Sequence, residues 1–262
     1  MVFEGTWSFV NALGNDFHSQ ATYPFQLARR QPMKFLFGAV GLAALIASDH
    51  TTQDILAPSS IADDTGFRIS MQDYSDAVSG RNALILVGGF GAIGFLADSP
   101  RERSTSMMLV ESLVTSGVWT EVLKKTTRRE RPREIDGRAS DWTGPGKVFA
   151  DEPVGGGLLS FPSGHSTGSW AVATVLAHQY PSHGIVPVAA YGAATLMSYS
   201  RMVVDAHWLS DVTIGALIGY GCARQVISAH EQRDAAAADS KGWQLNMDVT
   251  RQHTGVSLSY DF

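Results

Sequence analysis

Long apolar segments bounded by polar or turn-forming residues set the pattern of this chain. Six such segments are present, at residues 35–47, 83–97, 105–123, 165–179, 184–200 and 207–227. Segments of this length predict helices, and helices joined in sequence pack as antiparallel neighbours. We therefore expect an all-α fold, a six-helix bundle whose helices run alternately up and down.

The two ends of the chain differ from this central part. Residues 1–30 have apolar positions at helical spacing and predict an amphipathic helix or two short ones. The last residues, V-S-L-S-Y-D-F, alternate with a period of two, which predicts one exposed strand in an extended tail. Without an evident linker or internal repeat, we expect one domain with three parts: an N-terminal amphipathic segment (1–34), the helical bundle (35–230) and a polar C-terminal tail (231–262).

Composition narrows the class of protein. The apolar fraction of 44% is enough for a large core, and the net charge of −5 argues against a nucleic-acid partner. The single cysteine, Cys222, excludes an intramolecular disulfide and is expected to be a small core residue. The first residues, M-V-F-E-G-T-W, lack the basic and apolar regions of a signal peptide.

The stretch S-R-M-V-V-D-A-H-W-L-S-D carries the first candidate chemistry. On a helix, residues four apart share a face, so Asp211 can accept a hydrogen bond from one ring nitrogen of His207. That bond would leave the other nitrogen as a nucleophile. Arg201 keeps its charge and has a planar donor fork that suits a phosphate. Taken alone, the His and Asp would more often be a surface pair.

A second group of basic residues lies in K-K-T-T-R-R-E-R-P, where Lys124 and Arg131 are the candidates for anion binding. If they meet Arg201, the three cations would repel one another unless an anion lies between them. The alternative is a solvated basic loop, which we expect to account for Arg128 and Arg129.

The third stretch is F-P-S-G-H-S-T-G, just before a predicted helix. Backbone N–H groups at a helix start bind anions, and Gly164 lets the backbone approach a ligand closely. Ser163 could instead be a plain helix cap, and the two roles are compatible. In an up-and-down bundle, this stretch and the two others lie at the same end.

Together, K-x6-R-P, P-S-G-H and S-R-x5-H-x3-D resemble the motifs of the phosphatidic acid phosphatase type 2 and vanadium haloperoxidase superfamily over roughly residues 105 to 227. The resemblance implies that His207 attacks phosphorus and forms a phosphohistidine, and that Asp211 orients it. It implies that His165 protonates the leaving group and then activates water. The implied phosphate ligands are Lys124, Arg131, Arg201 and the backbone of Ser163 and Gly164.

This resemblance implies a metal-independent phosphoric ester hydrolase without a cofactor. Its substrate would be a phosphomonoester or diphosphate, either of a lipid or of a small molecule. Two alternatives remain: a haloperoxidase that uses vanadate as its cofactor, and an inactive helical membrane protein. In the hydrolase, vanadate would be an inhibitor. We also expect Asp205 to pair with Arg201, and Trp208 to pack at the rim of the bundle.

Whether the bundle crosses a membrane is open at this stage. A span needs about 20 apolar residues, and the two continuous runs, 35–47 and 83–97, are shorter. Their glycines and alanines suit helix packing in lipid, and Glu111 would have to face the interior. A membrane-associated protein is favoured over a soluble bundle. Its basic residues away from the motifs indicate an extracytoplasmic active site by the positive-inside rule: Arg29, Arg30, Lys34, Arg101, Arg103, Arg224 and Arg233.

Overall fold

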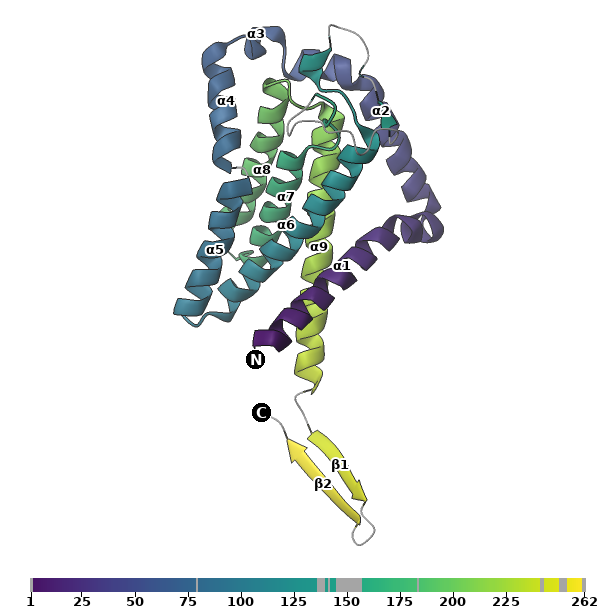
Figure 1. Cartoon of the computed structure of the whole chain (residues 1–262), viewed down its shortest axis with the longest axis vertical. Helices are drawn as coiled ribbons and strands as arrows, with labels where there is room; N and C mark the ends of the chain where they lie inside the picture. The colour runs from purple at the N-terminus through teal and green to yellow at the C-terminus, as the bar shows by residue number, and fades with distance from the viewer. Residues whose placement is uncertain are drawn as a thin grey trace. The chain divides into compact units, whose positions relative to one another are not determined.

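Helices form most of the described part of the chain in the computed structural model (Figure 1). The structure describes residues 2–78, 80–135, 140, 142–144, 157–182, 184–240, 243–249 and 254–260. The helices are α1 (Val2–Arg30), α2 (Pro32–Leu56), α3 (Ser59–Ala62), α4 (Thr65–Val78), α5 (Gly80–Leu96), α6 (Pro100–Thr127), α7 (Gly164–Gln179), α8 (Ile185–Val203) and α9 (Leu209–Ser240), with a 3-10 turn at Pro132–Glu134. The all-α prediction is confirmed.

The described residues form more helices than the six predicted for the bundle, and one of them, α1, is the amphipathic helix predicted over residues 1–30. The six apolar segments correspond to α2 and α5–α9, while α1, α3 and α4 come from polar or amphipathic stretches. Of these, α4 packs against α8, beside the end of the bundle where the three motifs lie. The sequence indicates this helix by placing its apolar residues on one face, and not by a high apolar content.

The chain forms two units, Met1–Val226 and Ile227–Phe262. In the second unit, β1 (Trp243–Val249) and β2 (Thr254–Tyr260) pair antiparallel, with Trp243 opposite Tyr260. The predicted C-terminal strand is present as β2, whereas its partner β1, in the first half of the tail, was not predicted. Helix α9 is also longer than predicted, since its last residues include four consecutive alanines, which favour helix.

Within the first unit, α6 and α8 end where α7 and α9 begin (Figure 1). Tight packing of α9 on α7 contributes to this arrangement. A Cβ on Gly215 would lie 2.5 Å from the carbonyl oxygen of Ser163, and a Cβ on Gly219 would collide with the carbonyl oxygen of Thr167. These two glycines, four residues apart, let the two backbones touch.

Helix α6 buries many polar side chains inside the bundle and exposes several apolar ones. Glu111 is buried, as we predicted for a glutamate in a helix that crosses a membrane. This turn and the next two also bury serine or threonine: Ser112, Thr115, Ser116 and Thr120. The apolar side chains that the same helix exposes include Met107, Val114, Val118 and Val122. This is the reverse of a helix in a water-soluble bundle.

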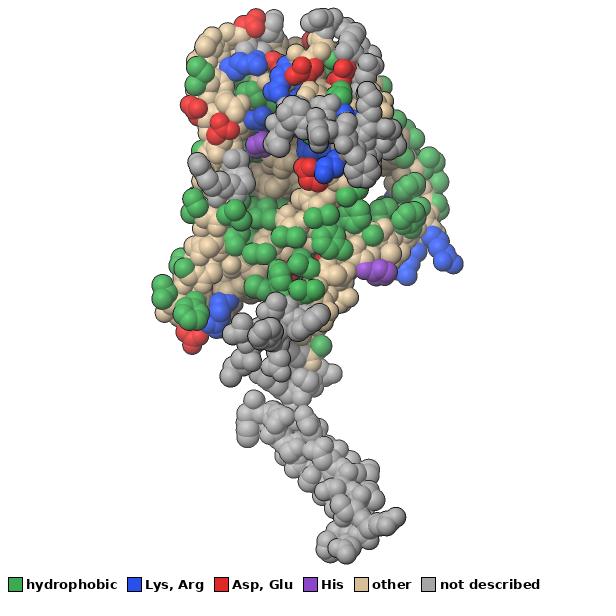
Figure 2. Space-filling model, in the orientation of Figure 1, with side chains coloured by type: hydrophobic (Ala, Val, Ile, Leu, Met, Phe, Trp, Pro, Cys, Tyr) green, Lys and Arg blue, Asp and Glu red, His purple; other side chains and the backbone are tan. Residues whose placement is uncertain are grey.

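Exposed apolar side chains extend over much of the bundle, whereas many of the charged side chains gather toward the end that carries the motifs (Figure 2). Three segments of the described chain are long and apolar enough to cross a membrane: Pro32–Leu56, Thr65–Leu96 and Leu209–Ala236. Such a large exposed apolar surface is unfavourable in water. The chain is therefore a membrane protein by the length, composition and exposure of its helices.

Candidate active site

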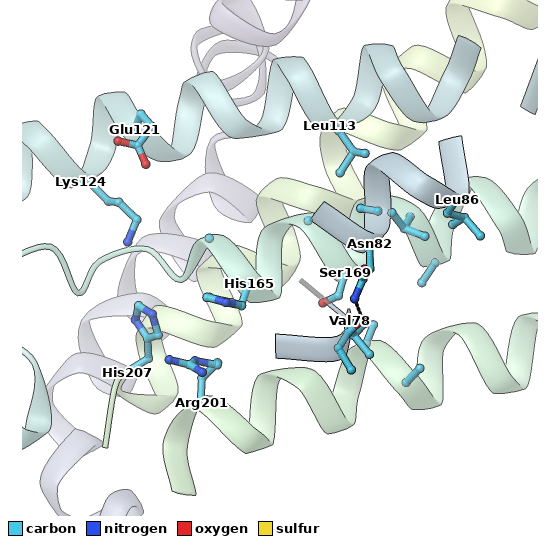
Figure 3. Close-up of a pocket in the computed structure, with 18 of the residues that line it drawn as sticks. Val78, Asn82, Leu86, Leu113, Glu121, Lys124, His165, Ser169, Arg201 and His207 are labelled. Carbon is cyan, nitrogen blue, oxygen red and sulfur yellow. Dashed lines mark hydrogen bonds between the residues drawn. The ribbon is translucent and has the colours of Figure 1, made fainter. Parts of the chain in front are cut away.

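Side chains from all three motifs line one open pocket of about 950 Å³. Figure 3 shows Lys124, His165, Arg201 and His207 extending toward a common space. Arg131 and Gly164 line the same pocket. The two remaining predicted residues, Ser163 and Asp211, are fully buried behind it. Residues that are far apart in the sequence thus meet at one end of the bundle.

His207 lies in the turn between α8 and α9. Its backbone N–H donates to the carbonyl of Arg201 over 3.2 Å, which closes the turn. Its side-chain Nδ1 lies 2.8 Å from the carbonyl oxygen of Ser160. Because a carbonyl oxygen only accepts, the neutral ring carries its proton on Nδ1. The lone pair is then on Nε2, so this nitrogen can act as the nucleophile.

Asp211 acts on His207 less directly than we predicted. Its Oδ2 lies 3.7 Å from Nδ1 of His207, which is beyond hydrogen-bond distance. That oxygen instead accepts from the hydroxyl of Ser160 at 2.5 Å and from the backbone N–H of Trp208 at 2.9 Å. The prediction of a direct bond is wrong, because the main chain of Ser160 takes the position beside the imidazole.

Both histidines are held neutral in the absence of an anion. Burial, then the charge of Lys124, lowers the pKa of His207 well below its ordinary value. Burial, then the charge of Arg201, lowers the pKa of His165 to about 4. A phosphate dianion placed among these cations would favour protonated His165. The site can therefore hold a neutral nucleophile and, once the anion is bound, an acid.

Backbone carbonyls position two of the cations. Lys124 Nζ donates to the carbonyl of Leu159 at 2.7 Å, and Arg131 donates to that of Ala206 at 3.0 Å. Burial, then Arg131, lowers the pKa of Lys124 to about 8. Burial, then Arg133, lowers the pKa of Arg131 to about 10. An anion between these groups would relieve their mutual repulsion.

The third cation, Arg201, is held by α4. Its guanidinium donates to the hydroxyl of Ser75 at 2.6 Å. The predicted Asp205–Arg201 pair is not formed, because the chain has left the helix at Asp205, whose φ is 52°. Asp205 instead pairs with Arg68 of α4 at 2.8 Å and accepts from Gln53 of α2 at 3.0 Å.

Arg129 is the main functional candidate that sequence reasoning missed. We expected Arg128 and Arg129 to be solvated, yet their exposures are 2% and 1%. Arg129 donates to Asp211 Oδ1 at 2.7 Å and to Asp49 Oδ2 at 2.6 Å. Asp49, just after the apolar run 35–47, could have indicated this role, since a buried carboxylate needs a partner.

The start of α7 matches the predicted cap. The hydroxyl of Ser163 accepts from the N–H of Ser166 at 3.5 Å, and the N–H of Ser163 donates to the carbonyl of Asp211 at 3.0 Å. A Cβ on Gly164 would have ordinary contacts with Thr120 and Lys124, so the role of this glycine toward a ligand stays a prediction. Trp208 is buried, as packing requires, and donates to the carbonyl of Glu130.

Among the residues that the structure describes, no cluster of three or more His, Cys, Asp or Glu side chains has the arrangement of a metal site.

A helical membrane bundle with a cationic pocket and two histidines defines the class to which this chain belongs. Residues 105–235, half of the chain, match the family model of the PAP2 superfamily. The chain therefore belongs to the PAP2 superfamily, as the three motifs predicted.

Relatives with known names support this assignment. The chain is 40% identical to the lipid A 1-phosphatase of Porphyromonas gingivalis over 68 residues, which are 26% of this chain and 15% of that protein. It is 30% identical to the lipid A 4'-phosphatase of Helicobacter pylori over 109 residues, 42% of this chain and 50% of that protein. The matched region is thus half or less of each relative's length.

A solved structure has the same fold. It is the first transmembrane PAP2 type phosphatidylglycerolphosphate phosphatase from Bacillus subtilis, with a TM-score of 0.54. The match covers 74% of this chain and 94% of that chain at 19% identity. At this identity the likeness concerns the fold alone.

Proposed function

We propose that this protein is a phosphatase that hydrolyses a phosphomonoester or diphosphate of a lipid through a phosphohistidine. The observation that carries the proposal is the pocket itself. A neutral histidine with its lone pair on Nε2 faces the same space as three cations and a second histidine. This combination suits covalent catalysis on a phosphoryl group.

In the first step, Nε2 of His207 attacks phosphorus and the bond from phosphorus to the leaving oxygen breaks. Protonated His165 gives its proton to that oxygen. As the His207 ring gains positive charge, the Ser160 carbonyl holds its Nδ1–H and the Asp211 carboxylate stabilises the charge from 3.7 Å. In the second step, His165 takes a proton from water, the water oxygen attacks phosphorus, and the P–N bond breaks.

Lys124, Arg131 and Arg201 would bind the phosphoryl oxygens through both steps. Their positions are set before the ligand arrives, by backbone carbonyls for the first two and by Ser75 for the third. Preorganised donors stabilise the developing charge without reorganisation at the moment of reaction. We propose that the start of α7, at Ser163 and Gly164, adds backbone N–H donors to the same site.

A lipid substrate is supported by the apolar wall of the pocket. Away from the cations, the lining residues include Val78, Leu86, Leu113, Leu176 and Ala193. A phosphate at the charged end would leave room for an apolar chain along this wall. The names of the lipid A phosphatases among its relatives point to the same class of substrate.

The proposed site is extracytoplasmic. The motifs lie at one end of the first unit, while Arg101 and Arg103 begin α6 at the other end and Arg29 and Arg30 precede α2. The positive-inside rule places such basic ends in the cytoplasm. Labelling of a single cysteine introduced at Lys125, after Cys222→Ala, tests this orientation with an impermeant reagent on intact cells.

The decisive experiment measures phosphate release by the purified protein in detergent. Phosphatidic acid, an isoprenyl diphosphate and a soluble phosphate ester are the substrates, each with and without a chelator, because the proposed reaction needs no metal. His207→Ala is expected to abolish release, whereas His18→Ala, a change of an exposed histidine on α1, is expected to retain it.

Vanadate provides an independent check. It is expected to inhibit release by occupying the phosphate position. Oxidation of halide by peroxide in the presence of vanadate would indicate the haloperoxidase chemistry instead. Full activity of His207→Ala would overturn the proposed mechanism.

A further inference from the structure

A buried carboxylate from outside the family region reaches the back of the site. Asp49 lies near the end of α2, outside residues 105–235, and its exposure is 1%. Its Oδ1 accepts from the backbone N–H of Ser210 at 2.9 Å, and its Oδ2 accepts from the Ser210 hydroxyl at 2.6 Å. It therefore holds the first turn of α9, the helix that carries Asp211.

Asp49 and Asp211 share one guanidinium. Arg129 lies 2.6 Å from Asp49 Oδ2 through one terminal nitrogen and 2.7 Å from Asp211 Oδ1 through the other. The second of these nitrogens also donates to the Ser210 hydroxyl at 2.7 Å. The planar guanidinium of Arg129 thus binds one carboxylate through each terminal nitrogen, which the single ammonium of a lysine could not reproduce.

The surroundings of Arg129 fix it further. Its Cζ lies 4.7 Å from the ring centroid of Trp142 and 5.3 Å from that of Trp208. Its Nε donates to the Ser140 hydroxyl at 3.3 Å. A guanidinium held by carboxylates and aromatic rings has a defined position, and its two terminal nitrogens join Asp49 to Asp211.

The path continues from Asp211 to the nucleophile. Asp211 accepts from the Ser160 hydroxyl, and the Ser160 carbonyl accepts from Nδ1 of His207. Two carboxylates and one guanidinium carry a net charge of −1, behind a histidine whose other side faces Lys124, Arg131 and Arg201. That negative charge is placed where the imidazole becomes positive during the reaction.

We infer that Asp49 is a positioning residue for the phosphatase reaction: through Arg129 and the start of α9, it sets the place of Asp211 and thereby of His207. This inference rests on the proposed function. Asp49 does not line the pocket, so it acts on the nucleophile and leaves the phosphate ligands in place.

Asp49→Asn tests the inference, because the amide has nearly the same shape but lacks the charge. We expect kcat to fall by about 10-fold or more with KM changed by less than about 2-fold, as for a group that acts in the transition state alone. Asp54→Asn is the matched control, since Asp54 is an exposed carboxylate of the same helix. It is expected to match the wild-type protein.

Ligand binding separates positioning from a merely structural role. Vanadate can take a fifth ligand from Nε2 of His207, whereas inorganic phosphate binds to the cations alone. In Asp49→Asn, we expect weaker vanadate binding and unchanged phosphate binding. Both are measured from the shift in unfolding temperature, which needs no turnover. Equal weakening of both ligands, or wild-type values for both, would overturn the inference.

A second variant covers the case in which Asp49→Asn does not fold. Ser210→Ala keeps both carboxylates and their direct bonds to Arg129, and removes only a hydroxyl that donates to Asp49 and accepts from Arg129. It is expected to lower kcat and vanadate binding in the same direction, by a smaller factor. If it behaves as wild type in both, the inference is wrong.

The two proposals fail in different ways. If His207→Ala loses activity while Asp49→Asn keeps it, only the role of Asp49 is refuted. If the wild-type protein releases no phosphate from any substrate, the proposed function fails, and with it this inference.

Discussion

The Asp211 carboxylate lies 3.7 Å from Nδ1 of His207, close enough to stabilise a positive imidazole but too far for a hydrogen bond. The Ser160 carbonyl, at 2.8 Å, makes that bond instead. The tautomer of the nucleophile is therefore set by the main chain, and Asp211 contributes charge. This division separates the two contributions experimentally, because the carbonyl remains when the carboxylate is changed.

Asp211→Asn should reduce activity without abolishing it. The nucleophile keeps its tautomer through Ser160, but the positive charge of the reacting ring loses its nearest buried anion. We expect kcat to fall by less than for His207→Ala, and by less than the about 10⁴-fold found where the carboxylate also sets the tautomer of the histidine. Steady-state phosphate release measures this difference. An equal loss in the two variants would contradict the division of roles.

Ser160→Ala should affect stability more than chemistry. It removes the hydroxyl that donates to Asp211 at 2.5 Å but keeps the carbonyl that binds His207. Loss of a hydrogen bond to a buried carboxylate costs about 1–3 kcal/mol. Denaturant unfolding in detergent measures the loss of stability. A drop in kcat larger than that of Asp211→Asn would show that the hydroxyl has a direct role.

Activity should decrease above about pH 8, the pKa of Lys124 in the protein without its ligand. The sign follows from the direction of the shift: burial and Arg131 lower this pKa from 10.5, so Lys124 loses its charge as the pH rises through 8. The decrease should appear in the pH profile of kcat/KM, which reports the free enzyme. In the pH profile of kcat it should occur at higher pH, because bound phosphate favours the charged ammonium of Lys124.

Lys124→Arg is the control for that decrease. An arginine keeps its charge over this range, so the decrease near pH 8 should disappear from kcat/KM, whatever the loss in absolute rate. If the decrease stays at the same pH in this variant, another group is responsible for it.

Gly219→Ala should destabilise the protein. The added Cβ would collide with the carbonyl of Thr167, so α9 must move away from α7. We expect a loss of about 1–3 kcal/mol, typical of overpacking, together with lower activity because the two helices carry His165 and Asp211. Thermal unfolding and phosphate release measure the two effects.

Gly221→Ala is the matched control in the same helix. A Cβ at Gly221 would contact nothing within 4 Å, and alanine favours helix over glycine. Its unfolding temperature should equal or exceed that of the wild type. A similar loss in both variants would show that helix propensity, rather than the α7–α9 contact, explains the effect.

The sequence predicts more of the fold than of the contacts that hold the site. The apolar segments predicted six helices and the shared end of the motifs, because helix formation and chain direction are local properties. They did not predict α4, whose side chains Ser75 and Arg68 hold Arg201 and Asp205. The amphipathic pattern of α4 is typical of a helix, but it does not show which residues of the bundle this helix contacts.

The sequence by itself determined which residue types face the pocket: His165, His207 and three cations follow from the motifs and their order. Only the tertiary structure decided what holds each of them. Asp49 and Arg129, a buried ion pair, are 80 residues apart. A buried charge takes whichever partner the packed helices bring within reach, since leaving it unpaired is costly. Those partners depend on helix packing and cannot be inferred from spacing along the chain.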